Sequence, residues 1–216
     1  MWKCCKNIIN VTLLGYHSIS HFHFNISWYI LLLLQRQNPE MDSVKAEEAS
    51  TLYNVVAMPY PGRSHINAMM NLCKILASKT NETINIDIIV TFVVTEEWLG
   101  FIGAEPKPDN IRFATVPNVV PSELVRAADH NSFFEATMTK LEAPFECLLD
   151  RLEPPATVIL AETFLFWAVG VGKRRNIPLA SFWPMAASMF TVFHHFNLLS
   201  QNGHFPLDVS GEVFNY

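Results

Sequence analysis

The most constraining feature of the sequence is a strand, turn and helix pattern around residue 60. Four apolar residues at 55–58 precede a turn that contains Pro59, Pro61 and Gly62. Apolar side chains then return at helical spacing, at Met69, Met70, Leu72, Cys73, Ile75 and Leu76. This order predicts a buried strand, a tight turn and an amphipathic helix. In open α/β sheets such a turn lies at the carboxyl end of a parallel strand, which is the edge where ligands bind.

A histidine, His65, follows this turn and is expected at the start of the helix. Its ordinary pKa is close to neutrality, and the partial positive charge of a helix N-terminus favours the neutral ring that can accept a proton. General-base catalysis is therefore one interpretation of His65. A polar residue that only begins the helix is the other, and this segment alone does not choose between them. Gly62 is expected to permit the turn.

The rest of the sequence alternates between two patterns. Segments typical of buried parallel strands lie at residues 85–94, which are rich in Ile and Val, and at 111–116, 157–161 and 179–183. Helical segments lie between them, at residues 96–102, 122–152 with an interruption near Pro144, and 166–175. The alternation predicts an α/β fold with a Rossmann-like, doubly wound parallel sheet and its active loops along one edge. Residues 1–39 show no sustained helical or strand period.

The turn carries a resemblance to a known family. Residues 59–71 read Pro-Tyr-Pro-Gly-Arg-Ser-His-Ile-Asn-Ala-Met-Met-Asn, which resembles the opening motif of the plant UDP-sugar-dependent glycosyltransferases, Pro-x-x-Gly-x-Gly-His-x-x-Pro. Ser64 and Ala68 replace the family's glycine and proline. The resemblance continues through residues 91–98, 113–117 and 164–172 and covers about everything from Leu52 to the end. It implies a family 1, inverting enzyme of the two-domain GT-B type, which transfers a sugar, expected to be glucose, from UDP to an acceptor hydroxyl.

The resemblance also supplies a partner for the histidine. In the family, an aspartate in Ala-Asp-x-Phe at the end of the fourth strand pairs with the catalytic histidine. Residues 161–164 read Ala-Glu-Thr-Phe here, so the matching acid is Glu162, which is one methylene longer. A carboxylate in this place fixes the tautomer of the imidazole and stabilises the imidazolium that forms. The alternative is a Glu162 that simply meets solvent at the end of a strand.

The acceptor is expected to lie beside this pair. Aromatic and methionine side chains suit flat apolar acceptors of phenolic, terpenoid or hormone-like type, although the same residue types also build cores. The acceptor-binding candidates are Gly62, Arg63, Ser64, Phe164, Trp183 and Met185. His194 and His195 are not expected to take part in catalysis. The resemblance implies a UDP-sugar as co-substrate, no permanently bound cofactor and no metal.

The family has a second domain, which holds the nucleotide sugar through a signature rich in Trp, His, Gly and Gln. No such signature occurs in these 216 residues. We therefore expect residues 51–216 to form an incomplete amino-terminal, acceptor-binding domain that is inactive alone, with the donor-binding domain absent. The alternative is a non-catalytic truncated paralogue or gene fragment that at most binds an acceptor or a partner. Residues 1–50 do not resemble the family, so we expect a disordered or artefactual leader, with Met41 as a natural start.

Composition and smaller motifs exclude several other classes. A net charge of −5 without a basic stripe argues against a nucleic-acid partner. The apolar run at residues 24–34 is shorter than the ~18 residues that span a bilayer, and no small-residue cleavage site follows it. We therefore expect no stable membrane insertion, a signal-peptide core being the alternative, and the resemblance to the family implies a cytoplasmic protein. His21 and His23 lack further metal ligands nearby. A dinucleotide-dependent oxidoreductase is disfavoured because the first turn lacks Gly-x-Gly-x-x-Gly.

Overall fold

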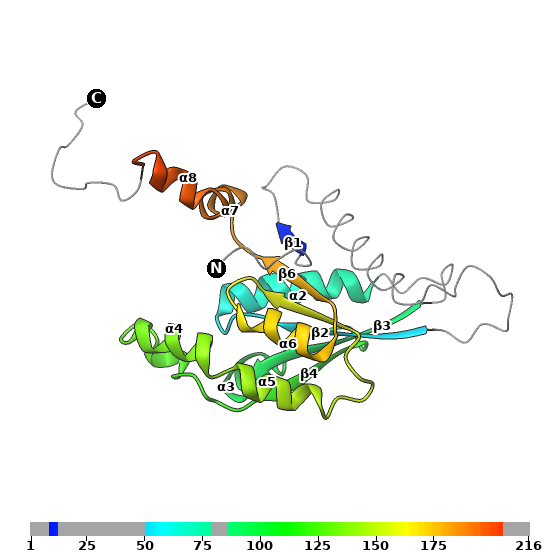
Figure 1. Cartoon of the computed structure of the whole chain (residues 1–216). Helices are drawn as coiled ribbons and strands as arrows, with labels where there is room; N and C mark the ends of the chain where they lie inside the picture. The colour runs from blue at the N-terminus through cyan, green and yellow to red at the C-terminus, as the bar shows by residue number, and fades with distance from the viewer. Residues whose placement is uncertain (1–8, 13–50, 79–85, 205–216) are drawn as a thin grey trace, which may run out of the picture.

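A six-stranded parallel sheet organises the protein (Figure 1). The computed structural model describes residues 9–12, 51–78 and 86–204. The strands, in chain order, are β1 Ile9–Thr12, β2 Thr51–Met58, β3 Ile86–Thr95, β4 Ile111–Val116, β5 Val158–Glu162 and β6 Leu179–Trp183. Their order across the sheet is β1-β6-β5-β2-β3-β4, and every neighbouring pair is parallel.

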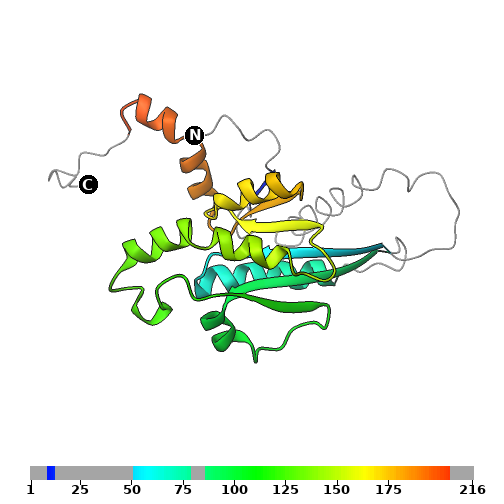
Figure 2. The ribbon, with the colours of Figure 1, turned by 60° about the horizontal axis from the view of Figure 1, so that its bottom comes forward.

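Helices cover both faces of this sheet. They are α2 Arg63–Ala77, α3 Glu96–Ile102, the short 3-10 helix η2 Glu123–Val125, α4 His130–Thr139, α5 Glu142–Leu149, α6 Trp167–Arg175, α7 Ala187–His194 and α8 Phe196–Gln201. Buried side chains of α2 and α3 join one apolar core, and those of α4, α5 and α6 join the other. The expected Rossmann-like, doubly wound α/β fold is therefore confirmed. α7 and α8, orange in Figure 2, project from the sheet, and none of their residues is buried.

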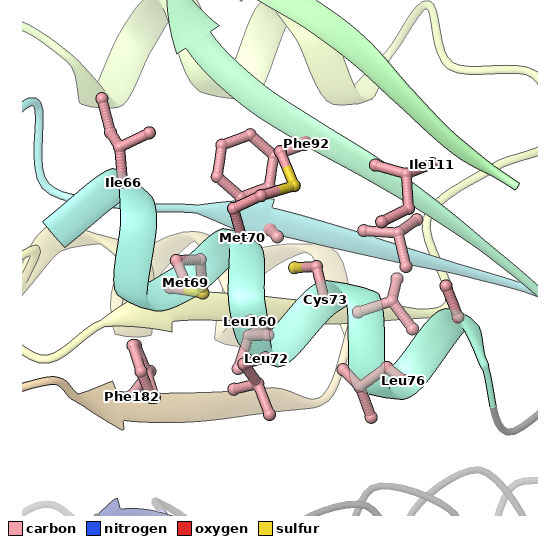
Figure 3. Packing of buried hydrophobic residues seen from close by; sticks show 14 of the residues in the cluster. Ile66, Met69, Met70, Leu72, Cys73, Leu76, Phe92, Ile111, Leu160 and Phe182 are labelled. Carbon is pink, nitrogen blue, oxygen red and sulfur yellow. The ribbon is translucent and has the colours of Figure 1, made fainter. Parts of the chain in front are cut away.

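The central strand β2 supplies both cores because its side chains alternate between the two faces. Val55 and Ala57 pack under α2, whereas Val56 and Met58 face the opposite helices. The apolar face of α2 lies on the sheet, as Figure 3 shows for Ile66, Met69, Met70, Leu72, Cys73 and Leu76. This packing fixes α2, and with it the residues in its first turn, against the carboxyl edge of the sheet.

The strand order reverses at β2, which pairs with β3 on one side and with β5 on the other. The connections after β2 and β5 therefore lie next to each other at the carboxyl edge. In open α/β sheets this switch point is where ligands bind. The fold thus brings together two segments that are about a hundred residues apart in the sequence.

The strand, turn and helix at 55–76 and the other expected strands are confirmed, with three differences in detail. Residues 9–12 form β1, paired with β6 from Ile9↔Ala180 to Thr12↔Trp183, although the sequence indicated no strand there. The other residues of the expected 1–50 leader lie outside the described part of the chain. The second difference concerns the helical region expected at 122–152, which is divided into η2, α4 and α5. The interruption expected near Pro144 falls at residues 140–141, just ahead of it, because Pro144 lies in the first turn of α5, where its missing N–H has no intrahelical partner to lose. Among the helices described, none combines the length and apolar character needed to cross a membrane.

Candidate active site

His65 and Glu162 form a hydrogen-bonded pair at the switch point of the sheet. His65 lies in the first turn of α2, and Glu162 is the last residue of β5. The imidazole Nδ1 is 2.8 Å from the carboxylate Oε1. The imidazole is 23% exposed and the Glu162 side chain is fully buried. The alternative that Glu162 meets solvent is therefore wrong.

The second oxygen of Glu162 is also bonded. The backbone N–H of Tyr60 donates a hydrogen bond to Oε2 at 3.0 Å. A buried carboxylate is costly unless its oxygens accept hydrogen bonds, and here both do. The extra methylene of glutamate therefore does not prevent the contact with His65. An ionised carboxylate can only accept, so an ionised Glu162 pairs with the imidazole tautomer that carries its proton on Nδ1.

Aromatic rings continue from this pair along the carboxyl edge of the sheet. The Tyr60 ring centroid lies 5.1 Å from that of His65 and 6.4 Å from that of Phe164. Phe164 in turn lies 5.5 Å from Trp183, and Trp183 lies 5.6 Å from Phe190 on α7. Burial raises the pKa of the Tyr60 phenol, so this group stays neutral across the physiological range. The aromatic row beside the imidazole therefore carries no charge of its own.

The expectation that Gly62 permits the turn through its conformational freedom is wrong. Its φ of −165° is an extended conformation that any residue adopts, so the turn does not depend on glycine. A Cβ at Gly62 would instead lie 2.8 Å from Arg126 Nη1 and 3.4 Å from His65 Cδ2. The absent side chain leaves room for the Arg126 guanidinium next to the imidazole.

Arg126 is a residue of this site that the sequence did not indicate. It pairs with Glu123 at 3.0 Å and stands 5.4 Å from the ring centroid of Phe133. Burial raises the pKa of the Glu123 carboxyl, and the neighbouring Arg126 acts in the opposite direction. The sequence indicated only a helical segment around residue 126 and no motif, so only the folded arrangement places this cation near His65.

The remaining acceptor-binding candidates differ in burial and in position. Phe164 is half-buried and belongs to the aromatic row, whereas Trp183 is only 3% exposed and donates its indole N–H to the Ala186 carbonyl. Met185 is half-buried after β6, and Ser64 is exposed in the first turn of α2.

The contacts of Arg63 are with Glu105 and Trp98, not with the His65–Glu162 pair. Its guanidinium pairs with Glu105 at 3.2 Å and lies 5.3 Å from the Trp98 ring centroid. His194 and His195 are exposed at the end of α7, where the His194 ring stacks on Phe190 and meets the His195 ring edge-on. In the described part of the chain, no group of three or more His, Cys, Asp or Glu side chains is arranged to hold a metal ion. His21 and His23 lie outside that part.

A Rossmann-like domain of this kind is the fold found in solved plant glycosyltransferases. Solved structures of similar fold include a UDP-glucose:anthocyanidin 3-O-glucosyltransferase in complex with UDP, with a TM-score of 0.56, 20% identity and coverage of 74% of this chain and 36% of that one. Another is Os79 from O. sativa in complex with U2F and trichothecene, with a TM-score of 0.54, 20% identity and coverage of 65% and 31%. At these identities the likeness shows the fold.

Sequence comparison identifies closer relatives. UDP-glycosyltransferase 87A1 of Arabidopsis thaliana is 56% identical over 153 residues, which are 71% of this chain and 34% of that protein. UDP-glycosyltransferase 87A2 of the same plant is 56% identical over 160 residues, with coverage of 74% and 34%. No protein-family model matches the sequence. Over this stretch the chain is a relative of the plant UDP-glycosyltransferases, as its motifs predicted, and it spans about a third of the length of these relatives.

Proposed function

We propose that the chain carries the acceptor side and the catalytic base of a UDP-dependent glycosyltransferase. The observation that carries the proposal is the 2.8 Å contact between His65 and a fully buried Glu162 at the switch point. In the reaction, Nε2 of His65 takes the proton of an acceptor hydroxyl. The acceptor oxygen bonds to the anomeric carbon while the bond from that carbon to the diphosphate breaks, so UDP leaves with the electron pair and the configuration inverts. Glu162 stabilises the imidazolium that forms.

The aromatic row supports a small lipophilic acceptor. A ring stacked near Phe164 would hold its hydroxyl toward the imidazole, and Phe166, two residues further along the chain, is 62% exposed. Related folds bind such molecules: one structure holds Phytolacca americana UGT2 with UDP-2fluoro-glucose and pterostilbene. We propose a phenolic, terpenoid or hormone-like acceptor, glucose as the sugar, and a cytoplasmic location without nucleic-acid or membrane partners.

The donor enters this proposal as a co-substrate. The residues described here offer the base and an acceptor wall, and we propose that groups outside this chain hold the UDP moiety. The chain alone is then inactive. The alternative is a protein that binds an acceptor without catalysis.

A chimaera separates these two functions. Residues 51–216 are joined to the part of UDP-glycosyltransferase 87A1 that has no counterpart in this chain, and UDP release is measured with a panel of hydroxylated acceptors. We expect turnover, and a decrease of roughly two to four orders of magnitude for His65→Ala, the usual contribution of a positioned base. His204→Ala, which changes an exposed histidine, serves as the matched control. A folded chimaera without turnover would favour the non-catalytic alternative.

A further inference from the structure

A groove of about 270 Å³ runs along α2 beside the connection from α3 to β4, and neither His65 nor Glu162 lines it. One wall is a polar stripe on α2, formed by Arg63, Asn67, Asn71 and Lys74. These residues follow one another at spacings of three and four, which places them on one face of the helix. The side-chain amides of Asn67 and Asn71 thus face the groove in its middle.

The end of the groove near the start of α2 is balanced in charge. Arg63 pairs with Glu105 there, and Arg63 also lies over the ring of Trp98. Glu105 is the one acidic residue among the described residues that line the groove. Its charge is therefore already compensated at this end.

The opposite end carries two cations. Asn110 donates a hydrogen bond to the Ala77 carbonyl at 2.9 Å, which holds the start of β4 against the end of α2. Lys74, one turn before Ala77, and Lys107, shortly before β4, consequently belong to the same end. The ammonium of Lys107 is fixed by a hydrogen bond to the Ile111 carbonyl. Among the described residues that line the groove, no carboxylate pairs with Lys74 or Lys107, since Glu105 is paired with Arg63.

The floor between the two ends is apolar. Ile66 and Ile102 are buried, Met70 lies beside them, and Phe113 contributes an aromatic ring that is 5.8 Å from the Lys107 ammonium. A ligand that packs on this apolar floor and pairs with the two cations therefore needs an apolar body and one anionic end. The volume, close to the lower limit for ligand pockets of about 300 Å³, restricts it to a small molecule.

We propose that this groove binds a small aromatic anion, with its ring on the Met70 and Phe113 floor and its carboxylate or phosphate ester at Lys74 and Lys107. Asn67 and Asn71 donate hydrogen bonds to the polar atoms of the ligand. The site is separate from the His65 pair and does not depend on sugar transfer, so it stands or fails independently of the proposed glycosyltransferase.

Binding is tested by ¹⁵N NMR on the full 216-residue chain, with phenyl phosphate, benzoate, inorganic phosphate and neutral benzyl alcohol as probes. We expect saturable shifts of the Asn67 and Asn71 side-chain amides with phenyl phosphate or benzoate, and the stronger of the two identifies the anionic group. Benzyl alcohol and inorganic phosphate should each bind at least about tenfold more weakly, because each lacks one half of the interaction. No saturable shift with either aromatic anion, or equal binding of benzyl alcohol or inorganic phosphate, overturns the proposal.

Variants then locate the anion. Lys74→Gln, at an exposed position that leaves the core intact, should weaken the better aromatic anion about tenfold, while Lys74→Arg retains binding. Lys140→Gln removes an exposed lysine at the C-cap of α4, outside the groove lining, and is the charge-matched control. Equal affinities for Lys74→Gln and Lys140→Gln show that the anion does not bind at Lys74 and overturn the assignment.

Discussion

Glu162 holds His65 through Oε1 at 2.8 Å and is itself held through Oε2 by the backbone N–H of Tyr60 at 3.0 Å. The carboxylate therefore connects the ends of β2 and β5 at the point where the strand order reverses. A glutamate of this length fits between its two partners. The shorter aspartate found in the family motif would have to span the same gap with one methylene less.

We therefore predict that both Glu162→Asp and Glu162→Gln weaken catalysis in the chimaera. Asp withdraws the carboxylate from the imidazole, for which we expect a loss of about tenfold or more. Gln removes the charge that stabilises the imidazolium and places an amide beside the Tyr60 N–H. Activity should therefore decrease more for Glu162→Gln than for Glu162→Asp. The kcat/KM of each variant decides the order. Equal values for all three side chains would show that the carboxylate takes no part.

The hydrogen bond between His65 and Glu162 can also be tested without measuring turnover. In the full chain, the Nδ1 proton of His65 should give a downfield NMR signal because it is held by Glu162. The signal should disappear in Glu162→Ala, whereas His204→Ala leaves it in place. Its persistence in Glu162→Ala would mean that another group orients the imidazole.

A second prediction concerns the donor. The contacts that hold a nucleotide sugar must outweigh several kcal/mol of lost translational and rotational freedom, and we propose that most of them lie outside this chain. UDP-glucose should consequently bind the 216-residue chain more weakly than about 1 mM in calorimetry, which corresponds to roughly −4 kcal/mol. The chimaera, measured in parallel, should bind it more tightly. A micromolar Kd for the chain alone would contradict the proposal.

The sequence predicted the elements with strong periodicity and missed the contacts made by distant segments. The strand at 55–58 and the helix after it have a clear apolar pattern, and both are confirmed. Glu162 was predicted from the family motif, because hydrophobic periodicity does not single out an acidic residue. The Tyr60 N–H and the Arg126 guanidinium reach the site only through packing between segments far apart in the chain. β1 is too short, at four residues, to show a period.

A third prediction uses the two cysteines that the structure describes. Cys73 is buried in the core under α2, and this burial raises the pKa of its thiol, whereas Cys147 on α5 is exposed. Because the thiolate is the reactive form, Cys73 should resist a thiol reagent until the protein unfolds. In a Cys4→Ser/Cys5→Ser background, one thiol should react in buffer and two in denaturant. Rapid reaction of both in buffer would show that α2 does not stay packed on the sheet.

The last prediction compares two helical glycines that differ in their surroundings. A Cβ at Gly100 in α3 would meet nothing within 4 Å, whereas at Gly172 in α6 it would lie 3.0 Å from the Ile177 carbonyl oxygen and 3.4 Å from Leu179 Cβ. Replacement by alanine gives each helix the same gain of roughly 0.5–1 kcal/mol in propensity. Crowding, which costs about 1–3 kcal/mol, opposes that gain only at Gly172.

Gly100→Ala should therefore raise the free energy of unfolding, and Gly172→Ala should lie about 1–3 kcal/mol below it. Urea unfolding of the two variants and the parent chain, with the same slope in all three, measures the difference directly. The shared propensity gain cancels between the variants, so the difference reports the closeness of α6 to the segment that leads into β6. Equal stabilities would show that α6 is packed less tightly against β6 than the structure indicates.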